Sequence, residues 1–447
     1  MATKLLVRAY NVEVGDCIYC RIPKGKKLKG NKYDDLHILI DCGSLGAIDC
    51  LKAAIAHLET MLPEEAEGKK RLDLLVVSHE HKDHMAGFDP TFFSNIKIEN
   101  IWMSASMDPE HPQANRSLRL RSLATRAMRN IASMNLSLCP ELENLVESYA
   151  INNDGAMEAL STKLPKVNRI TPKYVYAGMT AKALGLSLNE EVKIHILGPE
   201  RDIDRFYLGK DADESLLGLI ATGGAFKDGP TNPTAPAPAN ISRTDFRRLQ
   251  SRMMSSAFAF AELSGKVMNN TSVVLLIEWK GKRLLFVGDA EWDSRFKEGK
   301  SNCAWNVIWH ERRDLLQKPL DFLKVGHHGS ENATPWDDLQ TGKATEPGEI
   351  LNAILPLPRG RSKPTAQAIV STKRKNYEVI PCSALLAELG KRVKSVRNYS
   401  TALRDTASTL PKFKEFEKEW LNSPQPLRTD CENALTGASF VDVEIDA

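Results

Sequence analysis

The stretch Ser78–Gly87, which reads S-H-E-H-K-D-H-M-A-G, decides how the rest of the chain is interpreted. Although the 447 residues include only 10 histidines, this one turn holds His79, His81 and His84 together with Asp83. The run directly before it, residues 72–77, is apolar except for Asp73 and is typical of a strand buried on both faces, and a helix is expected from about His84. Imidazole and carboxylate groups fanned from a strand end onto a helix start can converge on a small volume. The pattern therefore predicts a site for zinc or another borderline divalent metal, and disfavours the alternative of a polar surface loop.

The pattern H-x-H-x-D-H resembles the signature of the metallo-β-lactamase superfamily. The resemblance extends to five further segments, whose order and spacing are similar to the branch that includes the hydrolase domain of the DNA-uptake channel protein ComEC. These segments are V-x-V-G-D at 12–16, L-I-D-C-G at 39–43, N-N-x-S at 269–272, L-x-F-x-G-D at 284–289 and K-V-G-H-H-G-S at 324–330. The resemblance implies an α+β fold, an αββα sandwich of two mixed sheets flanked by helices, with a two-metal centre at one edge of the sheets.

The resemblance also implies which residues hold the metal ions. His79 and His81 would hold a first ion, Asp83 and His84 a second, and Asp289 would bridge both. The implied cofactors are two divalent metal ions, zinc or manganese.

Three further histidines and one aspartate complete this picture. His327 would complete the second metal site, with His328 as the alternative ligand, and Asp41 would support the metal loops without ligating. Many family members have another histidine that completes the first site. The one candidate here is His195, within the expected strand 192–198, and a buried structural histidine is the competing interpretation. The first site is therefore expected to be open or incompletely occupied.

Such a centre predicts hydrolysis. Two close metal ions lower the pKa of bound water and stabilise the oxygens of an in-line displacement, which suits a phosphodiester. Asp83 is expected to orient the hydroxide and then take its proton, and His328 to donate to the leaving oxygen. Three polar side chains are expected to line the pocket and bind phosphate, or else to hold their loops: Asn270, Ser272 and Ser330.

Composition favours an ordinary globular protein. Hydrophobic residues make up 42% of the chain and charged residues 26%, and the formal net charge is +3. With no apolar signal-peptide core and no apolar run of about 20 residues, a cytoplasmic protein without a membrane partner is expected. The 8 cysteines are irregularly spaced and predict no disulfide framework. Cys17 and Cys20 lie on an expected strand, face opposite sides and are interpreted as packing residues.

The chain is interpreted as a single domain over residues 1–447 with two insertions. The first, about 105–170, is expected to be helical and basic, with Arg126 and Arg129 among its arginines. The second, about 201–266, contains a Pro-rich loop at 229–240 that is expected to be mobile. Residues 345–447 are expected to complete the fold. Strands are expected at 4–14, 17–22, 37–40, 98–104, 192–198, 273–279, 283–287, 319–325, 366–371 and 440–445, and helices at 48–61 and 382–391.

Charge distribution guides the choice of substrate. A hairpin tip at 23–32 carries five lysines, and the first insertion carries Arg116, Arg119 and Arg121 besides the two arginines already named. Basic surfaces bind nucleic-acid phosphates, so a nuclease acting on DNA or RNA is the first interpretation. The second is a small-molecule metallohydrolase for a cyclic nucleotide, a phosphocholine ester or a lactone. A non-catalytic scaffold is the third. Control by a regulatory protein partner or an activating protease is also considered, with the 229–240 loop as the cleavage site.

Overall fold

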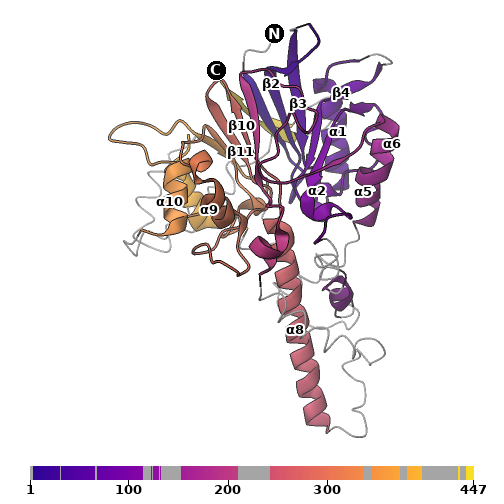
Figure 1. Ribbon diagram of the computed structural model, residues 1–447, viewed down its shortest axis with the longest axis vertical. Coiled ribbons are helices and arrows are strands. Elements are labelled where there is room, and N and C mark those ends of the chain that lie inside the picture. Colours follow the sequence, from indigo (N-terminus) through magenta and orange to yellow (C-terminus); the bar gives the residue numbers. More distant parts are fainter. Residues whose placement is uncertain are drawn as a thin grey trace.

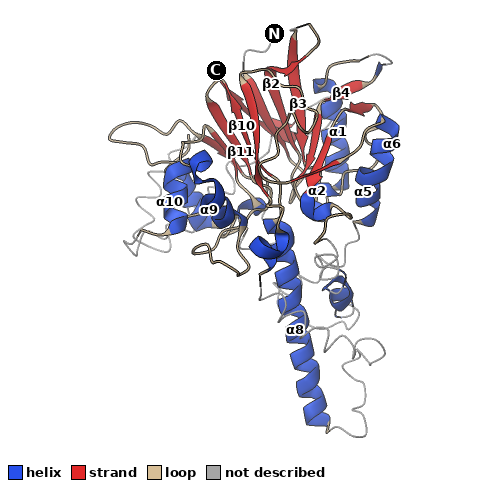
Figure 2. Ribbon diagram, in the orientation of Figure 1, coloured by secondary structure: helices blue, strands red, loops and turns tan. Residues whose placement is uncertain are grey.

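The computed structural model describes residues 4–30, 32–65, 68–113, 122, 124–129, 131, 153–209, 242–336, 344–372, 380–394, 431–432 and 439–447. The predicted loop at 229–240 and the arginines at 116, 119 and 121 lie outside the described residues. The fold is α+β, as predicted, with mixed sheets and helices (Figure 2).

The larger sheet is built mainly from the first part of the chain and closes with its last strands. Its order is β14-β15-β1-β2-β3-β5-β7-β8. From β3 onward the neighbours are parallel, whereas β15, β1, β2 and β3 are antiparallel. The bounds are β1 Leu5–Tyr10, β2 Ile18–Lys27, β3 Tyr33–Ile40, β5 Leu74–Val77, β7 Ile101–Ser104, β8 Lys173–Val175, β14 Cys431–Glu432 and β15 Ser439–Ile445.

The smaller sheet has the order β13-β12-β11-β10-β9. Strands β11, β12 and β13 are parallel, and β10 is antiparallel to both of its neighbours. The bounds are β9 Val192–Gly198, β10 Val274–Trp279, β11 Lys282–Phe286, β12 Phe322–Lys324 and β13 Gln367–Ile369.

The two sheets face each other across a shared apolar core, and β10 shows why its continuous apolar run forms a strand. Leu275 and Ile277 pack between the sheets, while Val274 and Leu276 pack on the opposite face beneath helices. Side chains alternate between the faces of a strand, so a strand that is covered on both faces is apolar at every position. Cys17 and Cys20 separate in the same way onto opposite faces of the larger sheet, as predicted, and both are free thiols.

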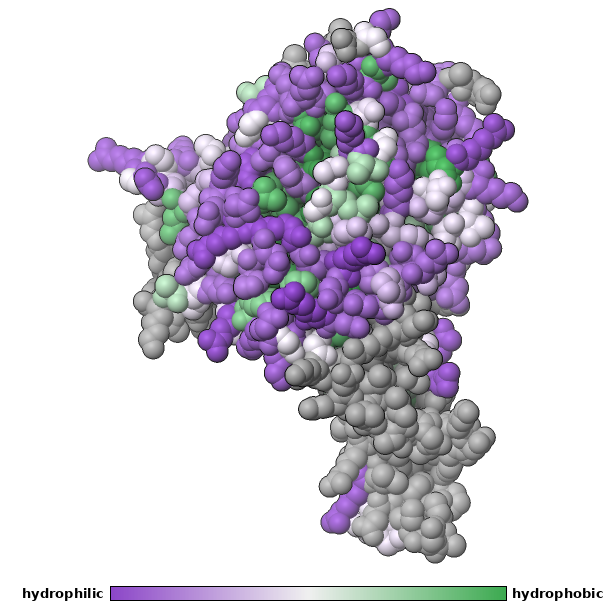
Figure 3. All heavy atoms as spheres, in the orientation of Figure 1, coloured by the Kyte–Doolittle hydropathy of each residue, from purple (hydrophilic) through white to green (hydrophobic). Residues whose placement is uncertain are grey.

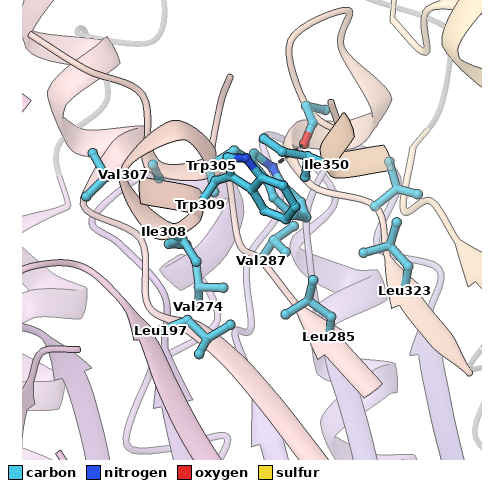
Figure 4. Packing of buried hydrophobic residues seen from close by; sticks show 14 of the residues in the cluster. Leu197, Val274, Leu285, Val287, Trp305, Val307, Ile308, Trp309, Leu323 and Ile350 are labelled. Atoms are coloured by element: carbon cyan, nitrogen blue, oxygen red, sulfur yellow. Dashed lines mark hydrogen bonds between the residues drawn. The ribbon is translucent and has the colours of Figure 1, made fainter. Parts of the chain in front are cut away.

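Helices cover the outer faces of both sheets (Figure 1). On the larger sheet, α1 (Ile48–Met61) buries Leu51, Ile55 and Leu58 against the strands. On the smaller sheet, α9 (Ala304–Leu316), α10 (Glu346–Ile354) and α11 (Ser383–Gly390) contribute to one core. Figure 4 shows Trp305 and Trp309 of α9 lying over the side chains of β10, β11 and β12.

The longest described helix, α8 (Arg243–Asn270), was not predicted from the sequence. Its 28 residues give a length of about 42 Å, and most of it projects away from the sheets (Figure 1). Its last turns enter the core beneath the smaller sheet, where Ala261 and Val267 are buried. Among the helices that the structure describes, none combines the length and the apolar character needed to cross a membrane.

The strand predicted at 72–77 is interrupted at Asp73. Asp73 lies between β4 (Lys70–Leu72) and β5, and its fully buried carboxylate pairs with Lys26 (2.7 Å) and Arg71 (3.0 Å). The predicted strand at 98–104 is likewise two strands, since β6 (Ile96–Ile98) pairs with β4 in a separate small sheet. The other short elements are η2 Ala105–Met107, α5 Asp154–Glu158, η3 Ala159–Lys163, α6 Leu164–Asn168 and η4 Asp204–Leu208.

The surface carries no large apolar patch in the view of Figure 3, where hydrophilic residues dominate and apolar ones show in separate groups. Within the described part of the chain, the exposed large hydrophobic residues are Tyr33, Ile48, Val167 and Leu357, which come from four different segments. The polar side chains at the ends of the strands are therefore the feature to examine for function.

Candidate metal centre

The candidate site forms where strands of both sheets end. Asp41 follows β3 and the 78–84 segment follows β5, while Asp289 follows β11 and His328 follows β12. The carboxyl ends of parallel strands meet at one edge of a sheet, and here two facing sheets bring such edges together. The short helix α2 (Lys82–Met85) begins within the 78–84 segment, close to the predicted start at His84.

Close contact between loop backbones holds the site together on the side of the larger sheet. The amide of Asp16 donates to Asp83 O (2.8 Å), and the amide of Gly43 donates to Asp16 O (2.9 Å). A Cβ atom on Gly43 would lie 2.2 Å from the amide nitrogen of His84, and one on Gly15 would lie 2.2 Å from Gly43 O. Only glycine allows this approach, so the V-G-D and D-C-G motifs serve to pack the loops together.

A first group of potential ligands consists of His79, His81 and Asp289. His79 Nε2 lies 2.9 Å from His81 Nδ1 and 3.6 Å from Asp289 Oδ2. His79 and Asp289 are each 1% exposed, so their polar atoms face a site shut off from bulk water.

A second group consists of Asp83, His84, Asp289 and His328, whose ligand atoms all lie within 4.8 Å of one another. His328 Nε2 is 2.8 Å from Asp83 Oδ2, and His84 Nε2 is 3.1 Å from Asp289 Oδ1. Asp289 belongs to both groups, with one carboxylate oxygen toward each. The structure thus brings together His79, His81, Asp83, His84 and Asp289, five of the six residues that the sequence assigned to metal.

Asp41 orients the second group without belonging to it. Its carboxylate accepts hydrogen bonds from Ser78 N (2.7 Å) and Ser78 Oγ (2.6 Å), and lies 2.8 Å from His84 Nδ1. This leaves His84 Nε2 directed at Asp289. Metal-binding histidines commonly donate their second ring nitrogen to a carboxylate in this way.

The structure places His328, which the sequence offered as the alternative ligand, in the second group in place of His327. The sequence assigned the ligand role to His327, yet it is His328 that lies in the second group, with Nδ1 2.9 Å from Ser371 O. His327 lies at the rim, where its side chain is 26% exposed and Nδ1 is 3.5 Å from Glu291 Oε1. Both histidines have positive φ angles (42° and 51°), a backbone conformation that turns the two rings apart at some cost in strain.

Glu291 is a site residue that sequence reasoning missed. Its carboxylate accepts from Asn269 Nδ2 (2.9 Å) and Asn270 Nδ2 (3.0 Å), at the end of α8, and it is 6% exposed. The sequence could have indicated Glu291 as a site residue, because it follows Asp289 by two residues and lies in the same turn.

The three residues predicted to bind substrate phosphate have protein partners instead. Asn270 Oδ1 accepts hydrogen bonds from the amides of Glu291 (3.1 Å) and Ala304 (2.6 Å), so this oxygen already has two donors from the protein. Ser272 Oγ accepts from the amide of Asp289 (3.1 Å), and Ser330 Oγ donates to Asn332 Oδ1 (2.9 Å). These contacts correspond to the loop-holding alternative.

His195 does not join the candidate centre. It lies on β9, and its Nε2 is 3.4 Å from Glu278 on the neighbouring strand β10. The described residues of the first group therefore offer three protein ligands, against four in the second.

Burial keeps the first-group imidazoles in the neutral form that binds metal. It lowers the pKa of His79 well below its usual value and lowers the pKa of His81 to about 4. Burial alone would raise the pKa of Asp289, but the neighbouring imidazoles, His84 first, outweigh it and hold the pKa well below normal. Asp289 is thus ionised and the first-group imidazoles are available for metal. In the second group the carboxylates outweigh burial and raise the pKa of His84, with Asp289 and Asp41 beside it, and of His328, with Asp83 beside it, so these imidazoles must release protons when metal binds.

The donor set fits divalent metal ions. Nitrogen and carboxylate oxygen atoms are the ligands preferred by zinc, and also suit manganese. His84 Nε2 is fully buried and lies 3.1 Å from Asp289 Oδ1, yet the two atoms are not aligned for a hydrogen bond. Such a short distance without hydrogen-bond alignment is expected of two ligand atoms that both point at one metal position.

The lysine-rich hairpin that the sequence predicted is present, but it lies away from the candidate centre. The hairpin between β2 and β3 precedes Tyr33, whereas Asp41 follows Ile40 at the other end of β3, about 23 Å away along seven residues. Lys26 within it pairs with Asp73 and Glu99, each at 2.7 Å. In the first insertion, Arg126 and Arg129 are exposed, while Ala127 and Met128 between them pack into the core that also holds part of α8.

Comparison of the sequence with protein-family models gave no match, and comparison with curated proteins gave no significant match.

Proposed function

We propose that this chain is a metal-dependent phosphodiester hydrolase, with nucleic acid as its substrate class. The observation that carries the proposal is the pair of ligand groups that share Asp289. The arrangement of helices, two facing sheets and helices supports the αββα sandwich of the metallo-β-lactamase superfamily, which the sequence motifs resemble.

His79, His81 and Asp289 would hold one divalent ion, and Asp83, His84, Asp289 and His328 would hold the other. When bound, such ions lower the pKa of water toward neutral and stabilise the anionic oxygens of a phosphodiester undergoing displacement. The second group supplies more protein ligands, so it is the one that should bind metal more tightly.

The protein groups around the centre have separate tasks in this proposal. Asp83 is partly exposed, at 13%, and its Oδ2 lies 2.8 Å from His328 Nε2, which holds the carboxylate in place; it would position water and accept a proton. His328 is buried and both its ring nitrogens have partners, so it is poorly placed to donate a proton to a leaving group. His327, at the rim beside Glu291, is the better donor to the leaving oxygen.

The exposed arginines Arg126 and Arg129 support a nucleic-acid substrate, since they are available for phosphate contacts. The lysine-rich hairpin does not support it, because it lies at the far end of the sheet from the centre. A small phosphodiester acting at the same centre is therefore the competing interpretation.

The decisive experiment supplies zinc or manganese to the full chain and compares single-stranded DNA, duplex DNA, RNA and bis(p-nitrophenyl) phosphate as substrates. Wild type is assayed beside His81→Ala and Asp289→Ala. Cleavage of a polynucleotide by wild type alone supports the proposal. Hydrolysis of the small ester without cleavage of any nucleic acid would mean that the substrate is a small phosphodiester. Lack of activity on every substrate, with metal bound, contradicts the proposed hydrolase.

A further inference from the structure

A buried lysine lies directly behind the candidate metal centre. Lys324 is the last residue of β12 and is 2% exposed. Side chains alternate along this strand, so Lys324 points to the same side as Phe322, into the core between the two sheets. A lysine at a position otherwise suited to an apolar side chain needs a partner, because burying an unpaired ammonium is costly.

The partner of Lys324 is Asp16, from the opposite sheet. Lys324 Nζ donates to Asp16 Oδ2 and to Val325 O, each at 2.9 Å, and Asp16 is 3% exposed. The two residues are 308 positions apart in the sequence. Asp16 Oδ1 has no hydrogen-bond partner among the described residues, and the carboxylate lies within 4.8 Å of ligand atoms of Asp41 and His84.

Asp83 and His84 of the second ligand group come from one segment of the chain and His328 from another, and each residue of this ion pair is connected to one of these segments. On one side, Asp16 donates its backbone amide to Asp83 O, and so holds the segment that carries Asp83 and His84. On the other side, only three residues separate Lys324 from His328. The two segments then meet again where His328 Nε2 lies 2.8 Å from Asp83 Oδ2.

The segment between Lys324 and His328 has little freedom to adjust by itself. A Cβ atom on Gly326 would lie 2.5 Å from Gly288 O, so the segment presses on the turn that carries Asp289. His327 and His328 both hold positive φ angles, which such residues keep only when fixed from both sides. Beyond them, the amide of Cys382 donates to Gly329 O (2.7 Å), and Lys324 supplies the anchor before them.

We infer that Lys324 and Asp16 form a positioning pair that brings His328 to Asp83 and so assembles the second metal-binding group from the two sheets. Stability alone is a weak reason for the pair, since buried ion pairs are often replaceable by apolar residues without loss of stability. The inference rests on the proposed metal centre, but it concerns metal binding and not the reaction.

The test is a titration of the metal-free, full-length chain with cobalt(II), followed by its visible absorption. Wild type should bind one ion in each group. Lys324→Met should weaken the second group by about 10–100-fold, the range found when a residue supporting metal ligands is lost. In a His81→Ala background, in which only the second group is intact, Lys324→Met should show the full loss of cobalt affinity. In the His328→Ala background, Lys324→Met should leave binding by His79, His81 and Asp289 unchanged.

Lys26→Met is the matched control. Lys26 pairs with Asp73 at 2.7 Å, with the two side chains 13% and 0% exposed, but at a distance from the metal centre. It should lower stability without changing cobalt affinity. Equal loss of affinity in both variants would mean a general effect of breaking a buried ion pair and would overturn the inference.

The double variant Asp16→Asn/Lys324→Met covers the case in which Lys324→Met does not fold, since it leaves neither charge unpaired. It should fold and still bind cobalt weakly at the second group. Wild-type affinity in either variant overturns the positioning role while leaving the proposed hydrolase intact. Failure of both variants to fold also overturns it, because the pair would then serve the fold as a whole. If wild type binds no cobalt, both the proposed metal centre and the positioning role of the pair are refuted.

Discussion

His328 Nε2 lies 2.8 Å from Asp83 Oδ2, although 245 positions separate the two residues in the sequence. Each residue comes from a strand end of a different sheet, so the candidate centre exists only when the two sheets face each other. This contact also distinguishes His328 from His327, whose ring turns toward Glu291.

Exchange of the two neighbouring histidines for alanine should have different effects on metal content. His328→Ala removes one of the four members of the second ligand group and should lower the metal affinity of that group, so that the purified variant contains less metal than wild type. His327→Ala should keep both ions but lose activity by about 100-fold, within the range for a proton donor. Elemental analysis of the purified variants measures the first effect and phosphodiester hydrolysis the second. Loss of metal from His327→Ala with retention in His328→Ala would contradict the assignment.

Asp41→Asn should weaken metal binding while leaving the fold intact. Asparagine accepts the positive φ of 56° at this position, but it cannot accept all the hydrogen bonds from Ser78 and His84. A loss of about 10–100-fold in metal affinity is expected. Asp321→Asn, at the start of β12 and away from the centre, is the control and should bind metal as wild type does. Unchanged affinity in Asp41→Asn would show that the carboxylate does not orient His84.

Gly43→Ala tests the close packing of the loops. Its new methyl group would overlap the amide of His84, so the free energy of unfolding should fall by about 1–3 kcal/mol, with reduced metal binding. Gly46→Ala is the matched control three residues later, where a Cβ atom meets nothing within 4 Å. Urea unfolding of the two variants measures the difference. Equal stability of both would refute the tight contact between residues 43 and 84.

Acid sensitivity should come partly from His37. Burial lowers its pKa to about 4, beside Tyr19 Oη at 2.7 Å from Nδ1, whereas in an unfolded chain the pKa is about 6.5. Between these values the unfolded chain binds a proton that the folded chain does not, so stability falls as the pH falls through this window. His37→Gln should reduce that fall by up to about 3 kcal/mol.

Urea unfolding at several pH values between about 7 and 4 measures the effect of His37→Gln. His310→Gln removes a half-exposed histidine and serves as the control. If the pH dependence is the same in wild type and His37→Gln, the buried neutral state of His37 does not contribute.

Charge reversals separate the two basic regions. Lys29→Glu/Lys32→Glu changes exposed residues at the hairpin tip, far from the centre, and should not alter KM for nucleic acid. Arg126→Glu/Arg129→Glu should raise that KM by about tenfold at moderate salt, because phosphate contacts are lost. Both should hydrolyse bis(p-nitrophenyl) phosphate as wild type does. A raised KM in the lysine variant alone would move the nucleic-acid surface to the hairpin.

Regular patterns in the sequence predicted much of the fold. The helix at 48–61 and the strand at 192–198 have the predicted bounds, because apolar spacing and flanking residues mark them clearly. The break at Asp73 was missed because the apolar residues around it read as one strand, whereas its carboxylate is buried by pairing with a residue 47 positions away. Likewise, α8 was missed because it begins within the 201–266 stretch, which matches no segment of the family pattern and was interpreted mainly through its Pro-rich loop.

The sequence motifs grouped the residues of the candidate centre, but they did not give side-chain direction. Adjacent histidines are equivalent in a motif, and the positive φ angles of residues 327 and 328 decide which ring turns inward. The contact of Lys324 with Asp16 depends on how the two sheets are stacked, which no local pattern encodes.

Strand β1 lies inside the larger sheet, between β2 and β15, and pairs with β15 along its whole length from Leu5↔Ile445 to Tyr10↔Phe440. During translation β1 is synthesised before both inserted regions and the entire smaller sheet, whereas β15 is synthesised after them. One edge of β1 therefore stays without its backbone partner while all of these segments are being made. Such an open edge is a site where chaperones bind and where nascent chains aggregate, so expression at low temperature with added chaperone should raise the yield of folded protein.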